Sequence, residues 1–233
     1  TSADDLLNRP NVRNDDARSK ALGAVRDYFA QVTGVDDQFG RLLQCLDENG
    51  LRDNTVVVYT ADHGEMMGSH GRMHKTVWYD ESFLVPFLIR YPGTVEPGRN
   101  DLLLSVPDLM PTLLGLAGHG AACPSDIHGR DLSAALIGGN GERPQSALFL
   151  NVGPDDPAGG WRGVRTHRYM LVIRPDDSGS DRVQLYDSFT DPYQQENIAA
   201  RRPEVVSELC DMLREWLTFT NDPWRGRQKL NEL

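Results

Sequence analysis

The chain has 233 residues, of which 39% are hydrophobic and 25% are charged, the balance of an ordinary folded domain rather than of a disordered or fibrous chain. Its formal net charge of −10 argues against binding to nucleic acid, because phosphate backbones require clustered Lys and Arg on the protein. No apolar run approaches the roughly 20 residues of a membrane-spanning helix, so we expect no membrane span.

The first predicted element is a long amphipathic helix over residues 16–49. Apolar side chains recur there at spacings of three and four, which is the period of one face of a helix. Gly50 follows the pattern and marks its end. We expect this face to pack into the core; it consists of Leu22, Val25, Phe29, Val32, Phe39, Leu42, Leu43 and Leu46.

A short strand is predicted next, over residues 55–60, with the sequence TVVVYT. This β-branched and aromatic run is typical of a buried parallel strand. In open α/β sheets, ligands bind outside the carboxyl ends of the strands. Asp62 and His63 follow the strand directly, so we expect a functional site at this position.

The residues after the strand have the chemistry of a site for a metal and an anion. Asp62 offers carboxylate oxygens and His63 an imidazole nitrogen, so both can bind one divalent cation from a tight turn at Gly64. Lys75 lies thirteen residues after Asp62, and its ammonium group suits a tetrahedral oxyanion held beside the metal. We therefore predict one site for a cation and an oxyanion.

Each of these residues also has a structural alternative. An isolated Asp-His pair more often forms a hydrogen-bonded turn, and a loop lysine is more often solvated; the surrounding pattern favours metal ligation and substrate contact. His70 and His74 flank the same loop. Either could contact a substrate, although a loop histidine is more often structural.

Downstream of Lys75 the chain continues with a strand over residues 83–91, stopped by Pro92 and Gly93, and with a helix over residues 105–117. A loop rich in Gly and Pro then runs to about residue 145, where we place a domain boundary. Beyond it we expect a small antiparallel sheet and one helix, with strands near Leu148, Val164, Leu171 and Leu185 and the helix at 203–219.

The segment TVVVYTADHGEMMGSHGRMHKTVWYDESFLVPFLIRYPG, residues 55–93, closely resembles the second signature region of the sulfatases, in the alkaline phosphatase superfamily. The similarity continues through DLMPTLL at 108–114 and through LYD, DP and EN at 185–187, 191–192 and 196–197. It spans roughly residues 20–220.

The resemblance implies an α/β fold, part of an alkaline-phosphatase/sulfatase-like sandwich with a small C-terminal antiparallel sheet and one helix. Residues 1–145 would be the C-terminal portion of the catalytic domain, and residues 146–233 a C-terminal α+β subdomain. A sulfatase of this kind is a hydrolase found in the periplasm or secreted, and we expect the same location here.

For the site, the resemblance implies that Asp62 and His63 bind a divalent metal. Calcium is the first choice, with magnesium or manganese as alternatives. It implies that Lys75 is catalytic and binds the sulfate group of a sulfate ester substrate. His70 and His74 are further candidates for binding that substrate.

The formylglycine nucleophile of the family has no counterpart in this chain. Its motif is a Cys or Ser followed two residues later by Pro or Ala and four later by Arg, and Cys45, Cys123 and Cys210 do not fit it. The family's upstream acidic metal ligands are missing as well. We therefore expect the formylglycine in the remainder of a longer parent sulfatase, with this fragment alone inactive.

Two other interpretations remain open. A phosphatase, phosphodiesterase or phosphonate ester hydrolase of the same superfamily would share the Asp-His-Gly turn; the pattern from Lys75 to Ser82 and the pair Tyr186 and Asp187 favour a sulfatase. The chain could also be a non-catalytic truncated module that retains half of a site.

Overall fold

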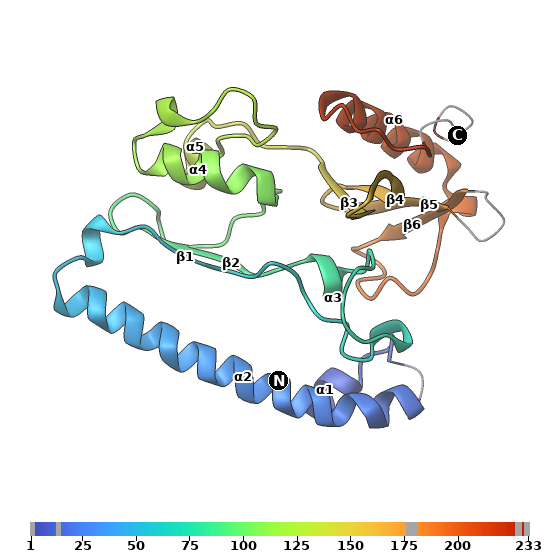
Figure 1. Ribbon diagram of the computed structural model, residues 1–233, viewed down its shortest axis with the longest axis horizontal. Coiled ribbons are helices and arrows are strands. Elements are labelled where there is room, and N and C mark those ends of the chain that lie inside the picture. The colour runs from blue at the N-terminus through green and yellow to red at the C-terminus, as the bar shows by residue number, and fades with distance from the viewer. Residues whose placement is uncertain (1–2, 13–14, 176–180, 227–229, 231–233) are drawn as a thin grey trace. The chain divides into compact units, whose positions relative to one another are not determined.

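A computed structural model describes residues 3–12, 15–175, 181–226 and 230. The chain divides into two units, Thr1–Glu96 and Pro97–Leu233, which are described separately (Figure 1). The predicted domain boundary after residue 145 lies inside the second unit, directly before its first strand, and stays a prediction.

The first unit contains a long helix, α2 (Asp15–Glu48), which agrees with the helix predicted over residues 16–49. Near its beginning, Ala21 and Val25 are buried against Leu7 of the short helix α1 (Ala3–Leu7). Further along, the side chain of Leu42 is 52% exposed. The prediction that the whole apolar face packs into the core is therefore wrong for Leu42 and for the exposed Val32. The other predicted residues of the later part, Phe39, Leu43 and Leu46, are half-buried. Periodicity shows which face is apolar but not what covers it.

The strand predicted after α2 is present as β1 (Val57–Thr60). Among the described residues it forms a two-stranded antiparallel sheet with β2 (Phe87–Arg90), in a register that pairs Val57 with Arg90. Only Val57 of its four residues is buried, so the expected buried parallel strand is wrong. β-branched residues favour a strand because they pack well on a pleated sheet, but they do not determine whether the strand pairs in parallel or antiparallel.

The second unit begins with a short 3-10 helix, Val106–Asp108, that leads into α4 (Leu109–Leu116), as predicted for residues 105–117. The carboxylate of Asp108 accepts hydrogen bonds from the backbone N–H groups of Ser105 and Arg130, both at 2.9 Å. This one side chain therefore caps the helix and anchors the loop that precedes α5 (Ser133–Leu136).

The predicted small antiparallel sheet and helix are confirmed in the second unit. Over the described residues the sheet has the order β3-β4-β5-β6 with every pair antiparallel. Helix α6 lies along one face of this sheet (Figure 1). The strands and helix are β3 (Ala147–Gly153), β4 (Asp156–Arg165), β5 (Tyr169–Pro175), β6 (Asp181–Asp187) and α6 (Pro203–Phe219).

The core between this sheet and α6 is apolar. Val164, Leu171 and Leu185 of the strands pack with Leu209 and Leu213 of the helix, and all five side chains are buried. Helix α6 places its apolar residues at helical spacing, so burial of this one face drives its docking. No helix in the described part of the chain has both the length and the apolar character needed to cross a membrane.

Among the described residues of this unit, the charged side chain of Arg162 is fully buried. The guanidinium of Arg162 on β4 donates to the carboxylate of Asp222 through Nε at 2.9 Å and Nη2 at 3.1 Å. It also donates to the carbonyl oxygens of Gly159 at 2.9 Å and Pro157 at 2.8 Å. Arg162 thus joins β4 to the segment that follows α6.

Replacing Arg162 with Met should destabilise the second unit, because Asp222 would keep a largely buried charge without its partner. Breaking a buried ion pair in this way costs about 3–5 kcal/mol. Urea unfolding followed by circular dichroism measures the change. The control is Arg225→Met, which removes an exposed ion pair with Asp156 and should change the unfolding midpoint little. Equal effects of the two substitutions would contradict this role of Arg162.

Candidate functional site

The candidate site lies on the long loop between β1 and β2. Asp62 is exposed and His63 is half-buried, two and three residues after the end of β1. The backbone N–H of His63 donates to Asp62 Oδ1 at 2.9 Å, which fixes the carboxylate against the turn. The second oxygen, Oδ2, lies 3.3 Å from His63 Nε2. The two side chains therefore present an oxygen and a nitrogen to one point.

The tautomer of His63 follows from its other ring nitrogen. Nδ1 lies 2.7 Å from the carbonyl oxygen of Gly64. A carbonyl oxygen only accepts hydrogen bonds, so Nδ1 carries the hydrogen and the neutral ring keeps a lone pair on Nε2. This is the arrangement in which a backbone carbonyl orients a metal-binding histidine.

Lys75 is brought to the same point. Its Nζ lies 2.5 Å from His63 Nε2, to which it donates a hydrogen bond, and its side chain is exposed. The three residues predicted from the sequence as metal ligands and sulfate-binding cation are thus adjacent in space. An ammonium group beside an oxygen and nitrogen donor pair can hold one oxygen of a tetrahedral anion while a cation holds another.

The donor set fits a divalent cation in kind. A carboxylate suits calcium, magnesium and manganese, and an imidazole suits zinc and other transition metals. Over residues 3–12, 15–175, 181–226 and 230, no group of three or more His, Cys, Asp and Glu side chains could hold a metal ion. Asp62 and His63 would therefore supply only part of a coordination shell.

The loop is closed at its base by Gly64. Its N–H donates to the carbonyl oxygen of Ser82 at 2.8 Å. A Cβ atom at this position would lie 1.9 Å from the carbonyl oxygen of Glu81, so no residue other than glycine fits without moving the backbone. The glycine is needed for this close approach, a reason that differs from the sharp turn expected from the sequence.

A second closure places Lys75. The N–H of Met66 donates to the carbonyl oxygen of His74 at 2.9 Å, and the carboxylate of Glu65 accepts a hydrogen bond from the His74 N–H. The two ends of the segment between residues 65 and 74 therefore lie side by side. Lys75 follows His74 directly, so this closure places Lys75 where its side chain can contact His63.

The backbone of this segment is strained. Four residues other than glycine have a positive φ: Met67 at 46°, His70 at 53°, His74 at 68° and Thr76 at 74°. Each such conformation costs on the order of 1 kcal/mol or more and persists only where packing enforces it. Met67 and its neighbours Met66 and Ser69 are buried, which supplies that packing. Strain of this kind is concentrated at functional sites in proteins.

The other two predicted substrate-binding residues take different positions. The ring of His70 stacks on the ring of Tyr79, with centroids 3.6 Å apart and planes inclined by 7°. The side chain of His74 is exposed, and its backbone is held by Glu65. Their contact with a substrate stays a prediction.

A contact missed from the sequence holds the loop from outside. Asn11 is buried. Its side-chain amide donates to Glu81 Oε1 at 2.6 Å, and its backbone carbonyl oxygen accepts from the backbone N–H of His70 at 2.8 Å. Arg9 Nη1 also lies 3.6 Å from Glu81 Oε1. Asn11 and Glu81 are separated by 70 residues in the sequence, and nothing in a single sequence signals their contact.

Comparison with known families agrees with this arrangement. A family model described as Sulfatase matches residues 1–119, and one described as N-sulphoglucosamine sulphohydrolase, C-terminal, matches residues 68–220. The first match covers the first unit with its site, and the second covers the whole four-stranded sheet and helix α6. The chain belongs to the sulfatase family.

Individual relatives give the same result. The chain is 39% identical to an endo-4-O-sulfatase of Bacteroides thetaiotaomicron, over 98% of this chain and 47% of the relative. A solved protein from work on glycosaminoglycan metabolism in the same organism superimposes with a TM-score of 0.88 at 37% identity, over 100% of this chain and 50% of that one. The chain thus spans about half the length of the relatives it matches.

Two further solved structures bear on substrate chemistry. One, a complex with its substrate D-glucosamine-2-N,6-O-disulfate, matches with a TM-score of 0.77 at 30% identity over 91% of this chain and 44% of that one. The other, a phosphonate monoester hydrolase from Silicibacter pomeroyi, matches with a TM-score of 0.70 at 28% identity over 97% of this chain and 46% of that one.

Replacing Gly64 with Ala should push the backbone at residue 64 away from residues 81–82 and destabilise the first unit. The expected cost is about 1–3 kcal/mol, the usual cost of inserting an extra methyl group into a tight contact. Thermal unfolding measures this loss. Gly23→Ala in α2 is the matched control, because no atom lies within 4 Å of its added Cβ and alanine favours a helix. A stable Gly64→Ala protein would show that the loop is not closed there.

Proposed function

We propose that the longer protein containing this chain hydrolyses a sulfate ester, and that this chain supplies part of its metal site and its sulfate-binding lysine. The observation that carries the proposal is the position of Lys75 Nζ, 2.5 Å from His63 Nε2, which itself lies 3.3 Å from Asp62 Oδ2. Membership of the sulfatase family supports the reaction.

The names of the relatives support a substrate class. We infer that the sulfate is carried by a carbohydrate, since one relative is named an endo-4-O-sulfatase and a solved neighbour holds a disulfated glucosamine.

The geometry supports a role for each residue. The Nδ1–H bond to Gly64 orients the His63 ring, so that Nε2 and Asp62 would hold a cation together. A cation at Nε2 would take the lone pair that accepts from Lys75, and the ammonium would then be available to neutralise negative charge on the sulfate. When bound, the divalent cation, calcium in our proposal and magnesium or manganese otherwise, polarises the sulfate oxygens. The formylglycine nucleophile would come from the remainder of the protein.

Replacing Lys75 with Ala in the longer protein should lower kcat for a sulfated saccharide by about a hundredfold, the usual scale for removing one preorganised charge from a reacting group. Steady-state hydrolysis measures it. Arg72→Ala is the control, because this cation is exposed on the same loop and has no assigned role. Unchanged kinetics for Lys75→Ala would remove the lysine from the site.

Replacing Asp62 with Asn should weaken calcium binding to the longer protein. Loss of a group that merely orients a metal ligand typically costs 10–100-fold in affinity, so loss of a charged ligand should cost at least about tenfold. Titration calorimetry of the metal-free protein gives the affinity directly. Asp53→Asn, an exposed acidic residue before β1, serves as the control. Equal calcium affinity for both variants would exclude Asp62 as a ligand.

A second candidate is supported by the similarity to a phosphonate monoester hydrolase. The same cation and ammonium group would hold a tetrahedral phosphonate as well as a sulfate, so the residues of this loop do not separate the two reactions. The family models favour the sulfatase, since both are described by sulfate chemistry.

A further inference from the structure

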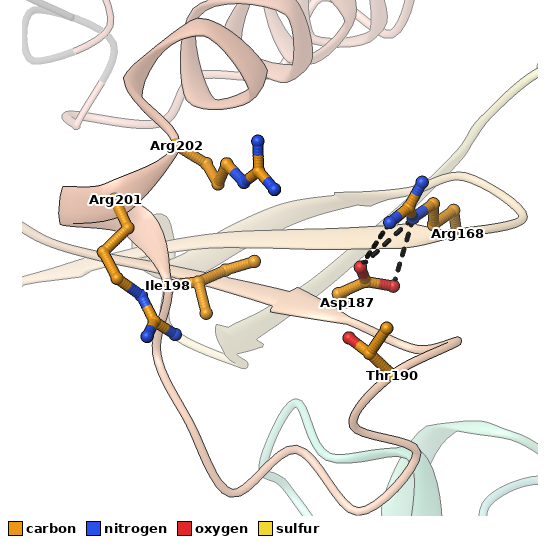
Figure 2. Close-up of a pocket in the computed structure, with 6 residues that line it drawn as sticks. All are labelled: Arg168, Asp187, Thr190, Ile198, Arg201 and Arg202. Carbon is orange, nitrogen blue, oxygen red and sulfur yellow. Dashed lines mark hydrogen bonds and ion pairs between the residues drawn. The ribbon is translucent and has the colours of Figure 1, made fainter.

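A cleft of about 430 Å³ lies on the second unit (Figure 2). It is formed where the β5-β6 end of the sheet meets the segment that leads into α6. Figure 2 shows three arginine side chains around it, with one carboxylate between them. The lining residues are Arg168, Asp187, Thr190, Ile198, Arg201 and Arg202.

Arg168 forms an ion pair with the carboxylate of Asp187. Arg168 donates to both oxygens of Asp187, through Nε at 3.2 and 3.1 Å and through Nη2 at 2.8 Å. The hydrogen bonds from Arg168, together with one from the Phe189 N–H, keep the pKa of the Asp187 carboxyl below its ordinary value. The pair is therefore ionised on both sides at neutral pH and forms a fixed wall of the cleft.

The other two arginines are weakly held. The side chains of Arg201 and Arg202 are 60% and 55% exposed, and their partners Glu196 at 2.8 Å and Glu204 at 3.6 Å are equally exposed. Exposed ion pairs of this kind contribute little to stability. Both guanidinium groups can therefore exchange a glutamate for an oxyanion, which they bind through a planar pair of donors.

Two aromatic rings lie close to Arg168, although neither is among the residues that line the cleft. The Arg168 guanidinium lies 4.9 Å from the ring of Tyr169 and 6.0 Å from the ring of Phe189. The Phe189 side chain is 69% exposed. An exposed ring beside cations offers an apolar face to the C–H groups of a sugar while the cations take its charged substituent.

We propose that this cleft binds a sulfate group of a sulfated carbohydrate, at a site built from the second unit alone. Its volume is within the range of small-molecule sites, and a sulfated monosaccharide fits that range. The net charge of −10 gives the chain no general attraction for polyanions, so binding would depend on these arginines. The choice of a carbohydrate rests on the proposed function; the binding of a sulfate group does not.

The test is calorimetric titration with a sulfated glucosamine disaccharide. All variants carry Lys75→Ala, which weakens binding of the disaccharide at the candidate catalytic loop. The affinity measured at the cleft is then independent of whether the proposed function is correct. The double variant Arg201→Ala and Arg202→Ala should bind at least about tenfold more weakly, which corresponds to the loss of one charge-assisted hydrogen bond. The matched control is Arg143→Ala and Arg225→Ala, which removes the same charge from exposed positions of the same unit outside the cleft.

A second variant works in the opposite direction. Glu196→Gln with Glu204→Gln frees both arginines without removing them, so it should tighten binding several-fold, a gain that misfolding cannot produce. The disaccharide without sulfate should not bind. Equal weakening in the control or no gain from the glutamine variant would overturn the proposal. Binding of inorganic sulfate as tight as that of the disaccharide would overturn the assignment of a carbohydrate ligand.

Discussion

The close contact between Gly64 and the backbone of residues 81–82 is the constraint on which the candidate site depends. It brings the end of β1 against the start of α3 (Asp80–Phe83), with a hydrogen bond to Ser82 and no room for a side chain. The residues between these points are closed into one loop that carries the lysine, and Asp62 and His63, the candidate metal-binding pair, directly precede the contact. The site is therefore a consequence of backbone packing first and of side-chain chemistry second.

The loop stores strain and is held in place by its surroundings. Four positive φ angles within ten residues cost several kcal/mol together, and the closure between Met66 and His74, the buried Met67 and the contact of Asn11 with Glu81 offset that cost. The loop therefore keeps Lys75 beside His63 before any ligand arrives. In the proposed reaction the ammonium would leave the Nε2 lone pair when a cation binds there, so the preorganised part is the backbone that places the lysine, and not the hydrogen bond to His63.

Most helices and strands, and the proximity of Asp62, His63 and Lys75, could be predicted from the sequence. Helical periodicity, strand composition and the sulfatase pattern are local signals. The sequence did not predict the antiparallel pairing of β1, the exposure of the Leu42 side chain on α2, or the contact of Asn11 with Glu81. All three depend on which distant segments contact one another. The ion pair of Arg162 with Asp222 and the cleft around Arg201 were missed for the same reason. An arginine in a sequence is read as exposed, and only the fold shows that Asp222 and several carbonyl groups surround it.

The most direct test of the account compares turnover of a sulfate ester and a phosphonate ester with the same alcohol by the longer protein that contains this chain. Intact mass under denaturing conditions first establishes that the remainder of the protein is present in the sample. The account predicts a higher kcat/KM for the sulfate ester, lost when the divalent cation is removed and restored when calcium is added. A preference for the phosphonate ester, or sulfate ester hydrolysis that is indifferent to the cation, would contradict it.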